Sequence, residues 1–244
     1  MRRLGATDLD VLEGLLDQHP GSPFFVKDLD LRYVAANRAM ARLCGLTTGS
    51  DLLGRCAGDL FGAELGSHYE HLDRVVLTTG RSLTNALEPT RTRDGDRAWL
   101  LFTRLPVRDV DGAVVGVAAN AHQLPNGHAT EGCYRRLKAA TEHIRRDFDQ
   151  QVSLRDIATR TGTSITQLER DFRKVFDMPP SAFLDTLRLD HAKGLLVDQA
   201  ISVASVAHAC GYADHSAFSR RFLKRVGTTP TEYRRGAQPR PSSA

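Results

Sequence analysis

Cysteine is scarce in this sequence, and the few that occur lie far apart. Cys44, Cys56, Cys133 and Cys210 form no Cys-x-x-Cys pair and no Cys/His cluster with the spacing of a zinc site. The sequence also lacks a Gly-rich phosphate-binding loop, a Ser/His/Asp constellation and a metal-spaced pair of histidines. We therefore expect no enzymatic activity, no bound metal, and cysteines that are reduced and mostly buried.

Long apolar runs are missing as well. The longest, residues 113–121, is far too short to cross a bilayer. The opening Met-Arg-Arg-Leu-Gly is followed by acidic and polar residues instead of the apolar core of a signal peptide. These features predict a cytoplasmic protein that does not associate with membranes.

Charge is divided unevenly along the chain. Residues 1–132 hold 14 Lys/Arg and 17 Asp/Glu, a net charge of −3, whereas residues 133–244 hold 19 and 12, a net charge of +7. The length of 244 residues suffices for two domains of ordinary size. An acidic half joined to a basic half indicates that only the second half meets a polyanion.

Residues 153–233 contain an internal repeat. Each copy has a serine, an alanine and a glycine at matching positions: Ser153, Ala158 and Gly162, then Ser202, Ala207 and Gly211. Matching residues are 49 apart up to the glycines and 50 apart after them, so the second copy has one extra residue in its turn. A serine can cap a short helix, and a glycine can adopt the left-handed conformation that ends it. Each copy therefore predicts a helix-turn-helix.

The second helix of each copy has one apolar and one polar face. Apolar residues recur at helical spacing, which commits one face to the core. The candidates for DNA contact are the polar residues near the start and on the other face: Ser164, Thr166, Gln167, Glu169, Arg170 and Arg173, then His215, Ser216, Ser219, Arg220 and Lys224. Arginine can bind guanine with two hydrogen bonds in the major groove, and serine or threonine can bind several base edges.

A plain helical bundle with solvated charged faces would produce the same pattern in a single copy. Duplication favours DNA binding, because DNA readers place two reading helices about 34 Å apart on one face of the duplex. Residues 181–198 lie between the copies, and as a helix they would span ~27 Å.

Residues 133–236 resemble the C-terminal domain of AraC/XylS-type transcription regulators. The most specific segment is Gly211 to Arg234, which is similar to the family signature Gly-Phe-x-x-x-Ser-x-Phe-Ser-Arg-x-Phe-Lys-x-x-x-Gly-x-Thr-Pro-x-x-Tyr-Arg. The resemblance implies two reading helices joined by one long helix, with promoter DNA and RNA polymerase as partners. Two departures stand out: Gly194 lies inside the joining helix, and residues 176–180 read Phe-Asp-Met-Pro-Pro where Gly-x-x-Pro is more usual.

The first half mixes short helices with strands. Helices are predicted at residues 7–19, 37–44, 51–53, 57–61 and 64–79, and strands at 24–26, 32–36, 82–93, 98–105 and 113–122. The pairs Asp94-Gly95 and Asp111-Gly112 are typical of bends between antiparallel strands. The first helix either covers the following domain or pairs with its twin in a homodimer, and we favour covering.

This half resembles the PAS fold of the small-molecule-binding type over residues 20–124. The matching pieces include Phe25-Val-Lys-Asp28, Tyr33 to Asn37, Leu53-Gly-Arg55 and Leu105 to Val117. The resemblance implies a five-stranded antiparallel sheet with flanking helices around a pocket that senses a ligand or cofactor, and often dimerisation. Candidate pocket residues are Phe25, Phe61, Trp99 and Phe102. The effector and any cofactor stay unknown, and His68 and His71 are interpreted as surface residues, not haem ligands.

The sequence thus predicts a two-domain protein: an N-terminal α+β PAS fold and a C-terminal all-α double helix-turn-helix. The expected divisions are a sensor domain at 1–124, a linker at 125–132, a DNA-binding domain at 133–236 and a disordered tail at 237–244. The predicted function is a sequence-specific regulator whose PAS domain senses a small molecule or partner. Two alternatives stay open: a PAS domain that only dimerises or docks, and, more remotely, a DNA-repair alkyl-acceptor enzyme.

Overall fold

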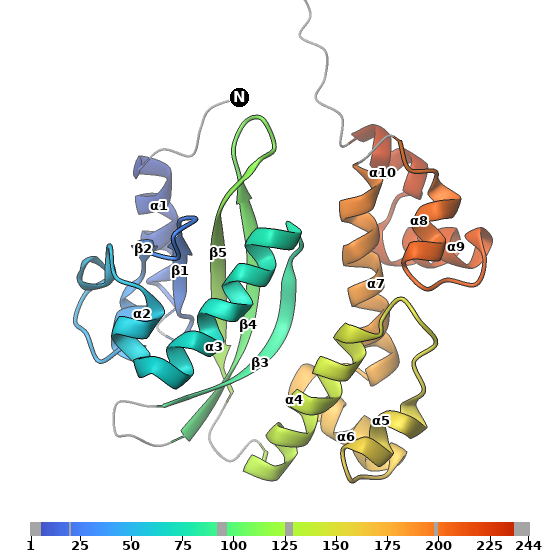
Figure 1. The fold of residues 1–244 in the computed structure, drawn as a ribbon, viewed down its shortest axis with the longest axis horizontal. Coiled ribbons are helices and arrows are strands. Elements are labelled where there is room, and N and C mark those ends of the chain that lie inside the picture. Colours follow the sequence, from blue (N-terminus) through green and yellow to red (C-terminus); the bar gives the residue numbers. More distant parts are fainter. Residues whose placement is uncertain (1–5, 20, 92–96, 125–128, 198–199, 237–244) are drawn as a thin grey trace, which may run out of the picture. The chain divides into compact units, whose positions relative to one another are not determined.

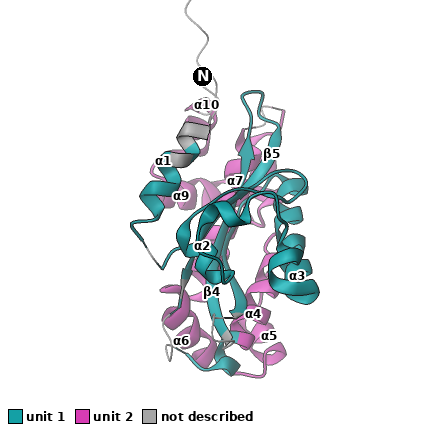
Figure 2. Cartoon of the chain, turned by 90° about the vertical axis from the view of Figure 1, so that its left-hand side faces the viewer, with its two compact units in different colours: residues 1–134 teal, residues 135–244 magenta. Residues whose placement is uncertain are grey.

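The computed structural model describes residues 6–19, 21–91, 97–124, 129–197 and 200–236. The chain divides into two compact units, residues 1–134 and 135–244, coloured separately in Figure 2. The predicted bend at Asp94-Gly95, most of the predicted linker and the predicted tail lie outside the described residues.

Unit 1 is built on a five-stranded antiparallel sheet, as the sequence predicts (Figure 1). Its strands are β1 (Phe24–Lys27), β2 (Tyr33–Ala36), β3 (Leu83–Arg91), β4 (Arg97–Arg108) and β5 (Val114–Gln123). They are arranged in the order β2-β1-β5-β4-β3. The first two strands therefore join the last three through the β1–β5 pairing.

The helices of unit 1 begin and end at residues that favour those positions. They are α1 (Ala6–Leu16), α2 (Arg38–Leu43), the 3₁₀ helix η1 (Gly49–Leu52) and α3 (Ala57–Thr79). Asn37 caps α2 by accepting a hydrogen bond from the Met40 amide at 3.0 Å. Helix α3 kinks at Gly62, whose φ of 75° is non-helical, so it consists of the two helical segments that the sequence predicts.

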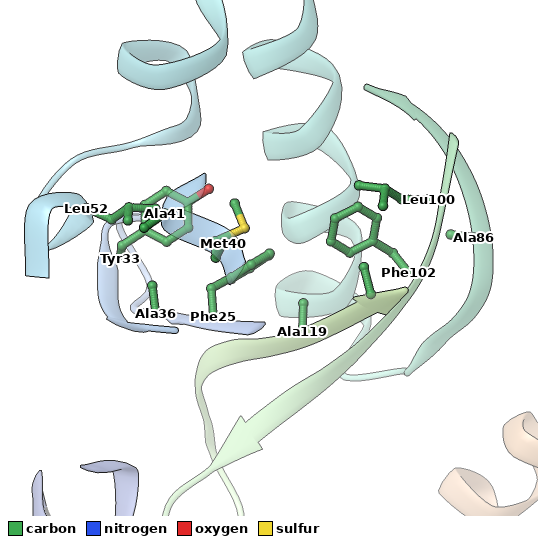
Figure 3. Close-up of a cluster of buried hydrophobic side chains, with 11 residues drawn as sticks. Phe25, Tyr33, Ala36, Met40, Ala41, Leu52, Ala86, Leu100, Phe102 and Ala119 are labelled. Carbon is green, nitrogen blue, oxygen red and sulfur yellow. The ribbon is translucent and has the colours of Figure 1, made fainter. Parts of the chain in front are cut away.

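The two faces of the sheet are covered differently. Helices α2 and α3 lie on the inner face, where Phe25, Tyr33 and Met40 approach Phe102 (Figure 3). On the outer face, Leu9 and Leu16 of α1 pack against a small cluster formed by Phe24, Val26 and Ala35. Helix α1 thus covers its own sheet, which agrees with the first of the two interpretations.

Unit 2 is helical throughout its described elements. They are the later part of α4 (Glu131–Arg146), α5 (Leu154–Arg160), α6 (Ile165–Phe176), α7 (Pro180–Leu196), α8 (Val203–Ala209), α9 (His215–Val226) and α10 (Pro230–Gly236). Helix α4 begins at Glu131, so two residues of the predicted linker are helical. The 17 residues of α7 rise about 25 Å, close to the span predicted for the joining helix.

Candidate nucleic-acid interface

Helices α5 and α6 form one helix-turn-helix, and α8 and α9 form the other. Gly162 and Gly211 take the left-handed conformation at the two turns, with φ of 65° and 74°. The Ser164 hydroxyl caps α6 by accepting from the Gln167 amide at 3.2 Å, and the Asp214 carboxylate caps α9 by accepting from Ala217 at 2.7 Å. The two second helices therefore start after side-chain caps that lie 50 positions apart, at equivalent places in the repeat.

Both second helices bury one face and expose the other. Leu168 and Phe172 of α6 are buried, as are Phe218 and Phe222 of α9. Opposite them, at intervals of four residues, each helix exposes a hydroxyl residue, an arginine and a lysine: Thr166, Arg170 and Lys174 on α6, then Ser216, Arg220 and Lys224 on α9. We call these six residues the basic stripe, since they give both helices the same chemistry on the same face.

One member of the basic stripe, Lys174, is not among the predicted contact residues. Lys174 lies 50 positions before Lys224, which is the offset of the repeat after its glycines. Applying that offset to every candidate would have found it.

The other predicted contact residues differ in their exposure and in the partners that they already have. Arg173 and His215 are exposed, whereas Gln167, Glu169 and Ser219 are half-buried. Arg173 lies 3.7 Å from the Glu169 carboxylate. The Ser164 hydroxyl is occupied by its capping bond.

A chain of hydrogen bonds holds one arginine of the basic stripe in place. Arg136 on α4 donates to the buried Asp171 carboxylate at 3.2 Å, and the Gln167 amide donates to the same carboxylate at 2.7 Å. The Gln167 carbonyl in turn accepts from Arg170 at 3.2 Å. Because Arg170 is tethered to a half-buried side chain, it loses less rotamer freedom on binding.

Helix α7 packs against both helix-turn-helix motifs (Figure 1). Phe183 in its first turn contacts Phe172 and Phe176 of α6, with ring centroids 5.7 and 5.3 Å away. Leu196 in its last turn belongs to the same buried cluster as Val206 of α8. One rigid helix therefore sets the separation of α6 and α9.

Unit 1 contains a second candidate site, a cavity on the inner face of the sheet. It is lined by Phe25, Lys27, Tyr33, Met40, Leu43, Phe61, Tyr69, Phe102 and Arg104. Three of the four predicted pocket residues are in this lining. The fourth, Trp99, is not: strand alternation places Leu100 and Phe102 inside and Trp99 on the outer face, stacked on Tyr134 with centroids 5.4 Å apart.

Four buried charged side chains stand beside this cavity. Lys27 Nζ lies 2.6 Å from Asp73, and Arg104 Nε lies 2.7 Å from the same carboxylate. Arg104 also binds both oxygens of Glu88. Burial alone would lower the pKa of the Arg104 guanidinium, but the carboxylates of Glu88 and Asp73 raise it well above its ordinary value. The Arg104 guanidinium is therefore charged at neutral pH.

The sequence contains a signal for these buried charges. Lys27 follows Phe25 by two residues, and Arg104 follows Phe102 by two. In a strand, residues two apart point to the same face. A charged residue two positions after an inward-facing aromatic residue of a strand therefore predicts a buried ion pair.

Other kinds of site are not assembled by the described residues. Among them, no three His, Cys, Asp or Glu side chains come together as metal ligands. His71 is exposed and His68 is half-buried beside Tyr69. None of the helices in the described ranges combines the length and apolar character needed to cross a bilayer.

The architecture and the basic stripe define a class, a helix-turn-helix protein with a second unit built on a five-stranded antiparallel sheet. A model of a helix-turn-helix domain matches residues 157–236, and a model of the PAS fold matches residues 18–124. The chain belongs to the AraC family of helix-turn-helix transcription regulators, with a PAS fold in its N-terminal unit. The chain is therefore classed with the transcription regulators and not with the DNA-repair alkyl-acceptor enzymes.

Three relatives illustrate the similarity. The chain is 28% identical over 210 residues to the HTH-type transcriptional regulator CdhR of Pseudomonas aeruginosa, covering 79% of this chain and 62% of CdhR. It is 32% identical over 99 residues to the HTH-type transcriptional activator RhaR of Mannheimia succiniciproducens, covering 41% of this chain and 36% of RhaR. A solved AraC-type regulator from Chromobacterium violaceum is 28% identical, with a TM-score of 0.42 over 46% of this chain and all of that one.

Proposed function

We propose that this chain is a sequence-specific DNA-binding transcription regulator whose PAS unit senses a small molecule or a partner protein and thereby modulates promoter binding. The observation that carries the proposal is the basic stripe, which repeats on α6 and α9 with the same three kinds of side chain. RNA polymerase is the protein partner that such a function implies.

The chemistry of the basic stripe suits the major groove. Arg170 and Arg220 can each bind the O6 and N7 atoms of a guanine, and the hydroxyls of Thr166 and Ser216 can bind a base edge or a phosphate. Lysines further along each helix supply charge to the phosphates. The net charge of +7 in residues 133–244 supports the same assignment.

The relatives support the proposal by their names. CdhR is named a transcriptional regulator and RhaR a transcriptional activator. The chain spans 62% of the first and 36% of the second, so their whole activities do not transfer directly.

Sensing requires that a ligand or partner bind two states of the protein with different affinities. The cavity in unit 1 is the candidate site for such a ligand, with Phe25, Phe61 and Phe102 in its lining.

A PAS unit that serves only for dimerisation is a second candidate function. Helix α1 leaves Val11, Leu12 and Leu15 exposed while Leu9 and Leu16 pack on the sheet. An exposed apolar row of this kind favours contact with a second copy. Light scattering of the Leu15→Lys variant against the unchanged chain separates a dimer through α1 from a monomer.

The experiment that tests the main proposal is selection of DNA from a random pool with the full chain, followed by affinity measurements. Arg170→Ala and Arg220→Ala should each cost about 1–3 kcal/mol at the selected sequence and less on random DNA. Arg74→Ala, an exposed arginine of unit 1, is the matched control and should change neither. Failure to enrich any sequence would overturn the proposal, and equal losses on both DNAs would show that the arginines bind only phosphate.

A further inference from the structure

The charged groups that line the unit 1 cavity are hydrogen-bond donors. Lys27 and Arg104 reach the lining, whereas their carboxylate partners Asp73 and Glu88 do not. An ammonium group has three N–H bonds, and the Asp73 carboxylate accepts from Lys27 at 2.6 Å. The same ammonium lies over the Tyr33 ring, 4.5 Å from its centroid, and therefore faces the aromatic part of the cavity.

The hydroxyls of the lining also keep their protons. Burial raises the pKa of Tyr33 well above its ordinary value and the pKa of Tyr69 to about 12. The Tyr69 hydroxyl donates to the Pro89 carbonyl at 2.7 Å. A ligand meets the Lys27 ammonium, which can only donate, so it must bring an acceptor for that group.

The charges beside the cavity are already balanced. Two cations, Lys27 and Arg104, face two carboxylates, Asp73 and Glu88. A charged ligand would add one uncompensated charge at a buried site, which is costly. An uncharged ligand avoids that cost.

Aromatic rings make up most of the remaining lining. Phe25, Tyr33, Phe61, Tyr69 and Phe102 surround the cavity, and aromatic side chains stack well on flat ligands. Figure 3 shows Phe25 and Phe102 in the inner core beside Met40 of α2, and the two rings are neighbours, with centroids 6.4 Å apart.

We propose that this cavity binds an uncharged, monocyclic aromatic or heteroaromatic compound that carries a carbonyl or ring-nitrogen acceptor, and that Lys27 donates to that acceptor. The inference rests on the sensing role in the proposed function and names its ligand class.

Binding requires the lining to move, because the cavity volume is about 10 Å³, which is room for one water molecule. Met40 is unbranched and adapts its shape easily. Phe61 is half-buried and directly precedes the Gly62 kink of α3. These two side chains are the ones that give way to a ring, while the ion pairs hold the sheet side of the cavity.

Three molecules of equal shape test the charge and acceptor requirement on the full chain: benzamide, benzoate and benzamidinium. Isothermal titration and thermal unfolding should show saturable binding of benzamide. Benzoate and benzamidinium should bind about tenfold weaker or worse, because one adds an unpaired charge and the other lacks an acceptor. Equal or tighter binding of either ion, or no binding of benzamide up to its solubility limit, overturns the inference.

Variants of the lining residues test whether the ligand binds in the cavity. Lys27→Met keeps most of the side-chain stem and removes the ammonium, so benzamide affinity should fall by about tenfold or more. Where that variant does not fold, Tyr33→Phe keeps the ring and should weaken binding several-fold. Trp99→Phe, on the outer face of the sheet, is the control and should leave affinity unchanged. Unchanged benzamide affinity in Tyr33→Phe and in any folded Lys27→Met protein overturns the placement.

DNA selection and benzamide titration on the same preparation of the full chain separate the two proposals. If it enriches a DNA sequence but does not bind benzamide, the ligand class is wrong and the regulator stands. If it binds benzamide but enriches no DNA, the regulator fails and the ligand class stands.

Discussion

Asp171 and Arg221 occupy equivalent positions of α6 and α9, 50 residues apart, and carry opposite charges. Asp171 binds Arg136 on α4, whereas Arg221 binds Asp185 on α7. The two partners, Arg136 and Asp185, are themselves 49 residues apart, which is the offset of the repeat before its glycines. The duplication therefore includes the supporting helices, and the ion pair is kept while its polarity is reversed.

The reversed polarity of the second ion pair predicts that the two side chains of the first pair, Arg136 and Asp171, can be swapped with each other. Arg136→Met leaves the buried Asp171 carboxylate without its cation and should lower the free energy of unfolding by about 1–3 kcal/mol. The double variant Arg136→Asp with Asp171→Arg reproduces the polarity of the second pair and should recover most of that loss. Urea unfolding of all variants measures the coupling. A double variant no more stable than either single exchange would contradict it.

The side chain of Gln167 should influence which base Arg170 reads. Gln167→Ala removes the acceptor that holds Arg170 and should weaken binding to the selected DNA by about 1 kcal/mol, mostly at one base position. The salt dependence of affinity should stay the same, since the number of phosphate contacts is unchanged. The second copy has Ala217 at this position, so the base preference of Arg220 provides an internal control. An equal loss at every base position would contradict a positioning role.

Helices α6 and α9 end differently, and this difference is open to test. Asp177 ends α6 with φ of 55°, where the second copy has Gly227 with φ of 84°. Asp177→Gly relieves the strain of a side chain in the left-handed region and should raise the free energy of unfolding by about 0.5–1 kcal/mol. Gly227→Asp should lower it by a similar amount. Thermal unfolding that showed the opposite order would contradict the strain.

Stability should decline at high pH because of the inner core. Burial raises the pKa of the Cys44 thiol to about 12, whereas a thiol in the unfolded chain titrates near about 8.5. The unfolded state therefore loses its proton first, so the stabilisation is complete below about pH 8.5 and is lost as pH rises toward 12. Denaturant unfolding of the unchanged chain should show this slope, and Cys44→Ala should show a shallower one. Identical slopes would rule out this thiol as the cause.

Trp99 holds the start of the helix that continues into unit 2. Its indole N–H donates to the Glu131 carboxylate at 2.8 Å, and its ring stacks on Tyr134. On the proposed sensing role, benzamide changes DNA affinity, and Trp99→Leu should reduce that change because the first turn of α4 is no longer fixed to the sheet. Affinity for benzamide itself should be unchanged. DNA titrations with and without benzamide make the comparison, and an undiminished ligand effect would exclude this route.

The extent to which the sequence predicted this protein differs between its two halves. In unit 2, Ser153 and Ser202 cap helices where they were expected to, because capping and helical periodicity are local properties. In unit 1, strand positions were predicted within a few residues, but Trp99 was assigned to the pocket. The face toward which a strand residue points depends on the register of the whole sheet.

By itself, the sequence determined the number of units, the repeat and its caps, the charge division between the halves and the polar face of each reading helix. Those properties depend on residues a few positions apart, or on counting. Only the tertiary structure decided that Lys27, Asp73, Glu88 and Arg104 meet in one buried group, and that Arg136 reaches Arg170 through Asp171 and Gln167. These contacts join residues up to 46 positions apart in one case and 35 in the other, and only the packing of helices and strands brings such residues together.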